Sequence, residues 1–203
     1  MTIESFMVRD DVQEFIKEIK AYDSIRLDEI PEYRLFISQI EEFFDKKLGK
    51  DSDDDDERKT ISKTMIQNYI KDGLIMPPEG KSYNRNHIIL LALIYNLKPI
   101  LTIRDIKKLL LPILEIADDE SQSNKIESIY STYFAMKESY LDEFINLIEH
   151  DLKIMDEKLD EEYCGEWEKL SKILLVLMLI TQANIRKRLA ERIIELYFST
   201  EED

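Results

Sequence analysis

The chain has 203 residues, of which 44% are hydrophobic and 35% are charged, and its formal net charge is -15 at pH 7. Four glycines and five prolines are few for a turn-rich sheet protein, and one cysteine excludes a disulfide framework within the chain. The apolar run Ile173 to Ile180 is too short to span a bilayer, and the first residues lack the features of a secretory signal. We therefore expect a cytoplasmic, all-α protein with no membrane partner.

The negative charge is unevenly distributed along the sequence. Residues 58–89 carry six basic and two acidic side chains, a net charge of +4, whereas residues 1–57 and 90–203 have net charges of -10 and -9. Phosphate groups respond to local positive potential rather than to the charge of a whole chain. This basic island is therefore the candidate surface for nucleic acid.

Helical periodicity begins near the N-terminus. A capping-box pattern starts a helix predicted over residues 11–21. Pro31 suits the first turn of a second helix, which continues to about Gly49. The acidic run Asp51–Glu57 lacks the ligand spacing of an EF-hand, so we interpret it as a solvated loop. One hypothesis is that it masks the neighbouring basic island.

Local chemistry specifies a short helix from Ser62 to Asp72. Ser62 is a natural N-cap, and Gly73 stands where the helix must stop in the left-handed conformation. Ile61 is placed to pack on Ile66 as a hydrophobic staple. The outer face carries Lys63, Thr64, Gln67 and Lys71. Such a face can contact base edges in DNA, although the alternative is a polar helix face that is merely solvated.

The residues after this helix predict a wing and two further helices. Met76–Tyr83 contains two prolines and is expected to form a loop-like wing rather than a β-ribbon. Asn84 is placed to cap the next helix, whose apolar run Ile88–Tyr95 predicts burial on nearly every side. Thr102 caps another helix, and Pro112 is expected to end or kink it.

Two long helices are predicted in the C-terminal part, over about residues 125–159 and 166–198. The first would extend about 50 Å, further than a small domain can cover, so it must pack on another element or another chain. An antiparallel hairpin with a leftover apolar face favours a homodimer. The tyrosines of the first helix suit its core or an interface, with a pocket for an unknown small-molecule effector as the alternative. These tyrosines are Tyr130, Tyr133 and Tyr140.

Two sets of short motifs can be compared with known families. The first set is Ser62, Ile66-Gln67-Asn68-Tyr69, Gly73-Leu74-Ile75, Tyr83, Leu101-Thr102-Ile103 and Ile106-Lys107. It resembles the winged-helix head of MerR-type transcription regulators. The second set is Thr64-Met65-Ile66, Asn68-Tyr69, Lys81-Ser82-Tyr83 and His87-Ile88-Ile89-Leu90. It resembles more closely a bacterial family catalogued only as a domain of unknown function, number 1836.

The resemblance covers roughly residues 30–112 and implies a winged helix-turn-helix fold that binds DNA. MerR-type heads usually carry an arginine at the position of Gln67 and another in the wing, where Lys81 is the nearest candidate. The predicted fold is therefore all-α, with a MerR-like winged helix-turn-helix head followed by a helical hairpin. The expected domains are an N-terminal helical extension (1–30), the head (31–117) and a C-terminal helical dimerisation or regulatory domain (118–203).

The leading hypothesis is a transcriptional regulator that binds double-stranded DNA as a homodimer. The expected DNA-binding residues are Lys59, Ser62, Lys63, Thr64, Gln67, Asn68, Lys71, Lys81, Tyr83 and Arg85. Among them, Lys63, Thr64, Gln67 and Asn68 would enter the major groove. Lys59, Lys71, Lys81 and Arg85 would contact phosphates. The alternative is a non-enzymatic protein-interaction module that keeps the fold without binding DNA.

No residue pattern points to catalysis, a metal or a cofactor. His87 and His150 lie in different segments, and neither has a second ligand at metal-binding spacing. Cys164 has no neighbouring histidine or cationic cluster that would activate its thiol. We therefore expect no enzymatic activity, and a capping or phosphate-facing role for His87.

Overall fold

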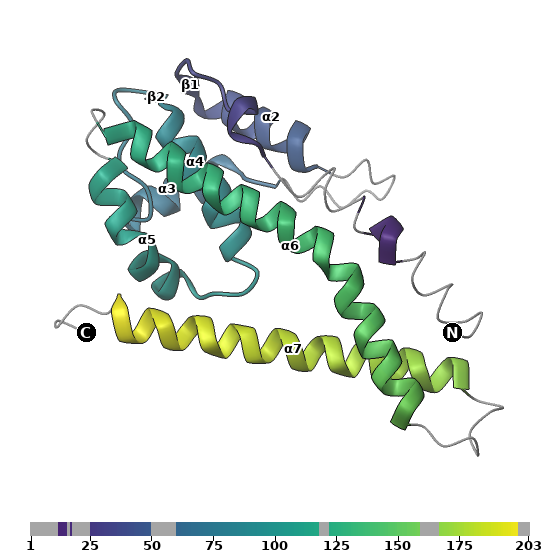
Figure 1. The fold of residues 1–203 in the computed structure, drawn as a ribbon. Coiled ribbons are helices and arrows are strands. Elements are labelled where there is room, and N and C mark those ends of the chain that lie inside the picture. Colours follow the sequence, from purple (N-terminus) through teal and green to yellow (C-terminus); the bar gives the residue numbers. More distant parts are fainter. Residues whose placement is uncertain are drawn as a thin grey trace. The chain divides into compact units, whose positions relative to one another are not determined.

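The computed structural model describes residues 12–15, 17, 25–49, 60–117, 122–158 and 167–198 (Figure 1). The chain divides into two compact units. We call Ala21–Ala135 with Ile193–Asp203 the head unit, and Met1–Lys20 with Met136–Arg192 the hairpin unit. The two long C-terminal helices each contribute residues to both units, so the division falls within helices.

Two sequence expectations lie mostly or wholly outside the described residues. Of the helix predicted over residues 11–21, the structure describes residues 12–15 and 17, which are helical. The acidic run Asp51–Glu57 is not among the described residues, so the masking hypothesis stays a prediction.

The head unit contains a two-stranded antiparallel sheet. Strand β1 is Leu35–Phe36 and strand β2 is Ser82–Tyr83, with Leu35 opposite Tyr83. Figure 1 shows the two strands side by side, with helix α2 (Ile37–Leu48) continuing from β1. Hydrogen bonds between the two strands pair backbone amide and carbonyl groups that would otherwise form hydrogen bonds within a helix.

The sheet corrects two predictions. The helix expected from Pro31 begins only at Ile37, because Leu35 and Phe36 pair with β2 first. The wing expected to be loop-like ends in a strand, since Ser82 and Tyr83 pair across the sheet despite the prolines before them. Both differences arise from pairing between segments far apart in the sequence, which local patterns do not encode.

Three further helices complete the N-terminal part of the head unit. They are α3 (Lys63–Lys71), α4 (Arg85–Leu97) and α5 (Ile103–Ala117), and a 3-10 turn at Leu27–Glu29 precedes β1. The caps expected for α4 and α5 are confirmed. The Asn84 side chain accepts a hydrogen bond from the amide of His87 at 3.3 Å, and Thr102 Oγ1 accepts one from the amide of Asp105 at 3.2 Å.

Helix α4 lies at the centre of the head core. Every residue from Ile88 to Ile94 is buried, as the sequence predicted. The core extends to the last helices, because Ile126, Tyr130 and Ile194 are buried in the same cluster. The Tyr130 hydroxyl donates a 2.6 Å hydrogen bond to the carbonyl of Ile25, and burial raises the pKa of this phenol.

Helix α5 continues through Pro112 instead of ending there. A proline inside a helix removes one hydrogen bond and crowds the preceding turn. Here Leu110 and Ala117 on either side are both buried in the head core, so packing holds the helix on both sides of the proline. Of the two outcomes expected at Pro112, an end of the helix was therefore wrong, whereas a kink stays a prediction.

The two long helices predicted from the sequence are confirmed as α6 (Ser123–Lys158) and α7 (Trp167–Tyr197). Within the hairpin unit they pack against each other in antiparallel order. Gln182 donates a 2.6 Å hydrogen bond to Asp151, and Leu175 is buried with residues of α6 such as Leu152. None of the helices described has a length and hydropathy sufficient to traverse a bilayer.

Candidate nucleic-acid interface

Helix α3 is fixed at both ends by the local chemistry that the sequence predicted. At its start, Ser62 Oγ accepts a hydrogen bond from the amide of Met65 at 3.3 Å. At its end, Gly73 has a φ of 70°, the left-handed conformation that glycine adopts without strain. The Leu74 amide donates to the Tyr69 carbonyl at 2.8 Å, and the Gly73 amide donates to the Ile70 carbonyl at 3.1 Å. These two hydrogen bonds form a Schellman motif, which ends the helix and satisfies carbonyl groups of its last turn.

The two faces of α3 have different environments. Ile66 and Tyr69 on the inner face are 0% and 4% exposed. The side chains of the outer face are all exposed: Lys63, Thr64, Gln67, Asn68 and Lys71. The expected groove-facing residues therefore do lie together on one accessible surface, held from behind by the head core.

Helix α2 holds the N-terminal end of α3. Glu41 accepts a 2.7 Å hydrogen bond from the backbone amide of Lys63. Asp45 accepts hydrogen bonds from both the amide and the hydroxyl of Thr60, at 3.1 and 2.7 Å. These carboxylates satisfy amide and hydroxyl donors at and just before the first turn of α3, so α3 has a fixed direction relative to α2.

A tight turn precedes β2 and presents Lys81 to solvent. Gly80 has a φ of 62°, and both the amide and the hydroxyl of Ser82 donate to the Glu79 carbonyl at 3.1 Å. Arg34, just before β1, forms a 2.7 Å ion pair with Glu79 and ties the two sides of the sheet together. Lys81 itself is exposed at this turn.

Three expected contact residues have structural roles, and one is not described. Tyr83 is 5% exposed, and its ring packs edge-on against His87 with centroids 5.3 Å apart. Arg85 donates a 2.7 Å hydrogen bond to the carbonyl of Leu27, and its side chain is only 17% exposed. Ser62 caps α3, as described above, while Lys59 lies outside the described residues. The exposed surface of α3 and the wing therefore does not include Ser62, Tyr83 or Arg85, and Lys59 is outside the part of the chain that the structure describes.

His87 forms part of the cap of α4. The backbone amide of Asn84 donates to His87 Nδ1 at 3.2 Å, which completes the reciprocal capping box. The side chain is 3% exposed, so the capping role is confirmed and contact with phosphate is not available to it. Burial lowers the pKa of His87 and favours the neutral ring.

Two lysines beside α3 were not identified from the sequence. The Lys98 ammonium lies 6.0 Å from the centroid of the Tyr69 ring. The Lys107 ammonium comes within 3.4 Å of the position that a Cβ atom on Gly73 would occupy. Both lysines are exposed, and they place positive charge at the C-terminal end of α3. A net-charge window extended to residue 110 would have included both lysines, because residues 60–110 hold eight basic and three acidic side chains.

The assembled surface consists of hydrogen-bond donors and cations on a rigid helix. It offers the amides of Gln67 and Asn68, with Lys63 and Lys71 on the same face. Groups of this kind suit a polyanion with polar edges rather than an apolar ligand. Among the residues that the structure describes, no three His, Cys, Asp or Glu side chains cluster closely enough to hold a metal ion.

The fold and the surface together define a predominantly helical protein with a small two-stranded sheet and an exposed basic helix that contacts α2. A family model described as "Domain of unknown function (DUF1836)" matches residues 25–133. The match covers more than half of the chain, so the protein belongs to the DUF1836 family. No curated protein and no solved structure matches the chain.

Proposed function

We propose that the protein is a DNA-binding transcriptional regulator whose head is a MerR-like winged helix-turn-helix. In this proposal α2 and α3 form the helix-turn-helix, and the turn before β2 is the wing. The side chains of Lys63, Thr64, Gln67 and Asn68 read base edges in the major groove, while Lys71 and Lys81 contact phosphates.

The observation that carries the proposal is the outer face of α3. The side chains of this face are exposed, and they combine two amides with two lysines in the one basic region of an acidic chain. A helix with nine residues and caps at both ends presents these side chains in a fixed arrangement. Because the backbone of this helix is already ordered, DNA binding would not bear the entropic cost of ordering it.

The surrounding structure supports a wing and a second phosphate-contacting edge. Lys81 stands at a tight turn that the Arg34–Glu79 ion pair holds against β1. Lys98 and Lys107 add positive charge near the other end of α3. Phosphate contacts on both sides of a recognition helix would fix its register on the duplex.

The test is selection of duplex DNA from a randomised library by the full chain, followed by binding measurements over a salt series. We expect an enriched sequence motif and an affinity that falls steeply with salt. Replacement of Gln67 by alanine should relax the preference at one base pair, whereas Lys81→Ala should weaken all sequences alike.

Failure of this test would favour the alternative function, a non-enzymatic protein-interaction module. In that case no duplex would be enriched, and no binding would be detected even at low salt. The net charge of -15 repels DNA, and this repulsion is least screened at low salt. Binding at low salt would therefore require specific contacts from the basic surface.

A further inference from the structure

The buried His87 side chain, in the first turn of α4, is close to both ends of the segment Met76–Tyr83, which we call the wing segment. At one end, the Tyr83 ring packs edge-on against the imidazole with centroids 5.3 Å apart. Burial raises the pKa of this phenol, so it stays neutral near pH 7. At the other end, the backbone of Met76 and Pro77 is close enough to the ring to affect its charge. The imidazole is therefore placed to hold the wing segment on α4.

The two nitrogens of the His87 ring have different surroundings. Nδ1 accepts a 3.2 Å hydrogen bond from the backbone amide of Asn84, the residue that joins β2 to α4. It also lies 2.6 Å from the acceptor Oδ1 of the same asparagine. Nε2 is buried and forms no hydrogen bond with any residue that the structure describes. Because only an unprotonated Nδ1 can accept from the Asn84 amide, this contact requires the neutral ring.

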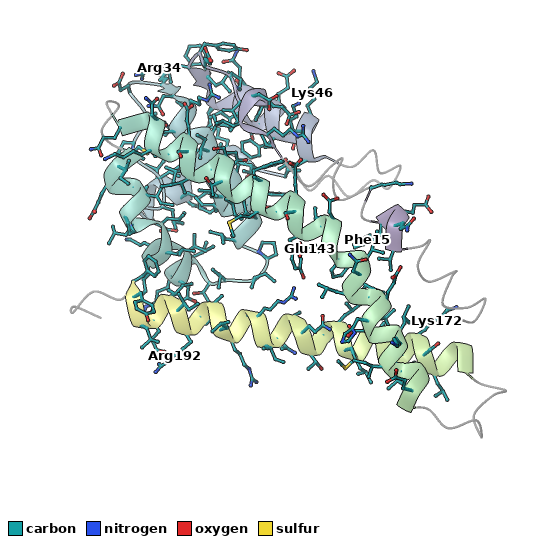
Figure 2. The ribbon with its side chains drawn as sticks, in the orientation of Figure 1. Phe15, Arg34, Lys46, Glu143, Lys172 and Arg192 are labelled. Atoms are coloured by element: carbon teal, nitrogen blue, oxygen red, sulfur yellow. The ribbon has the colours of Figure 1, made fainter. Side chains whose placement is uncertain are left out.

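Burial has a larger influence on the ring than the polar and charged groups around it. It lowers the pKa of His87, while the backbone of Pro77 and Met76 acts in the opposite direction. Of the charged groups that act on the ring, Arg34 lowers the pKa and Glu79 raises it. These two side chains form a 2.7 Å ion pair with each other, and Figure 2 labels Arg34. The ring is therefore neutral at pH 7 and takes up a proton only at lower pH.

We propose that His87 is a pH-sensitive contact that holds the wing segment on α4 while the ring is neutral and releases it when the ring is protonated. A proton from solvent changes Nδ1 from an acceptor into a donor. The new N–H can donate to Asn84 Oδ1, but the Asn84 backbone amide then faces another donor and loses its acceptor. A buried imidazolium and an unpaired buried amide both destabilise the closed arrangement, and water satisfies both when the wing segment moves away.

This inference adds regulation to the proposed function, and it rests on that function for its effect on DNA. Lys81, the expected phosphate contact, lies in the wing segment, so release of the segment would weaken binding as the pH falls. Release itself does not require DNA and can be measured without it. If the wing segment opens on protonation but no duplex is selected, the proposed function fails and this inference stands.

Hydrogen exchange of the full chain, followed by NMR, measures the release. After correction for intrinsic exchange rates, the amides of Ser82 and Asn84 should lose protection in the wild type between about pH 7.5 and about pH 5.5. One pH unit below the ordinary histidine pKa of 6.5, the loss should reach up to about tenfold, since the open state takes up the proton first. The Asp105 amide, which Thr102 caps without a histidine, should keep its protection.

The matched variant is His87→Gln. Glutamine at the third position of a helix can accept the same hydrogen bond from the Asn84 amide, and it does not titrate. This variant should therefore keep the Ser82 and Asn84 amides protected over the whole pH range. His150→Gln is the control, because His150 is the second of the two histidines and is exposed on α6. The control should lose protection as the wild type does.

The wild type alone decides the question if His87→Gln does not fold. Loss of protection at Asn84 should begin near pH 6.5 and level off at the pKa that the ring resonances of His87 report. Protection that does not change with pH, an equal loss at Asp105, or the same loss in a folded His87→Gln variant would each overturn the inference.

Discussion

Two apolar runs of nearly the same composition have opposite environments in this protein. Ile88–Ile94 in α4 is buried at every residue. In the run Ile173–Ile180 of α7, Leu175 alone is buried, and the neighbouring Val176 and Leu177 are more than half exposed. The head unit supplies α4 with neighbours on all sides, whereas in the hairpin unit α6 covers one face of α7. Burial is therefore set by how many elements surround a helix and not by the hydrophobicity of its sequence.

The largest expected effect compares the two runs directly. Leu90→Ala in the head core should lower the free energy of unfolding by about 4 kcal/mol, because Leu90 is 0% exposed and its removal leaves a cavity. The matched substitution Leu175→Ala should cost nearer 2 kcal/mol, since Leu175 is 8% exposed and lies in a small cluster. Urea unfolding followed by circular dichroism measures both. If the two variants lose the same free energy of unfolding, the head core is not packed more tightly around α4 than the hairpin unit is around α7.

The next effect concerns the end of α3. Gly73→Ala places a side chain at a φ of 70° and should destabilise the head unit by about 1 to 2 kcal/mol. The new Cβ would also lie 3.4 Å from the Lys107 ammonium, a contact that this flexible side chain can relieve. Thermal unfolding measures the loss. If the thermal unfolding midpoint of Gly73→Ala equals that of the wild type, the Schellman motif does not determine where α3 ends.

The start of α3 should contribute slightly less. Ser62→Ala removes the side-chain cap on the Met65 amide and should cost about 1 kcal/mol. Ser62→Asp supplies an equivalent oxygen and should retain most of the stability. Hydrogen exchange at the amides of α3 reports this locally. If the α3 amides exchange faster than in the wild type, and by the same factor in Ser62→Asp as in Ser62→Ala, then capping is not the role of this residue.

The smallest expected effect is a dependence of head stability on pH. Burial lowers the pKa of His87 below its ordinary value of 6.5, so the unfolded chain takes up the proton first as the pH falls. The free energy of unfolding should therefore be level above pH 6.5 and decrease as the pH falls through that value toward the folded pKa. His87→Phe should flatten this dependence in the range where carboxylates remain ionised. An identical pH profile in the variant would exclude His87 as its source.

The features predicted correctly from the sequence depend on neighbouring residues. Ser62, Asn84 and Thr102 each cap a helix through a hydrogen bond to the amide three residues later. Gly73 ends α3 through hydrogen bonds to the turn that precedes it. Contacts of this kind span fewer than six residues, so the local sequence contains both partners.

The features missed from the sequence depend on residues brought together by the fold. Leu35 forms a strand only because Tyr83 lies opposite it. Arg85 has the charge expected of a phosphate contact, yet the carbonyl of Leu27 and the carboxylate of Glu127 occupy its guanidinium group. Lys107 reaches Gly73 through the packing of α5 beside α3. None of these partners could be assigned from sequence spacing.

The most direct test of the account is the salt dependence of DNA binding by two lysine variants. Lys71 lies on the outer face of α3, and Lys46 is an exposed lysine near the end of α2 in the same unit, labelled in Figure 2. On the duplex selected by the wild type, Lys71→Ala should lower the affinity and reduce the slope of log affinity against log salt by about 1. Lys46→Ala should leave both unchanged. Equal behaviour of the two variants, or no duplex selected at all, would contradict the claim that α3 is a DNA-reading helix.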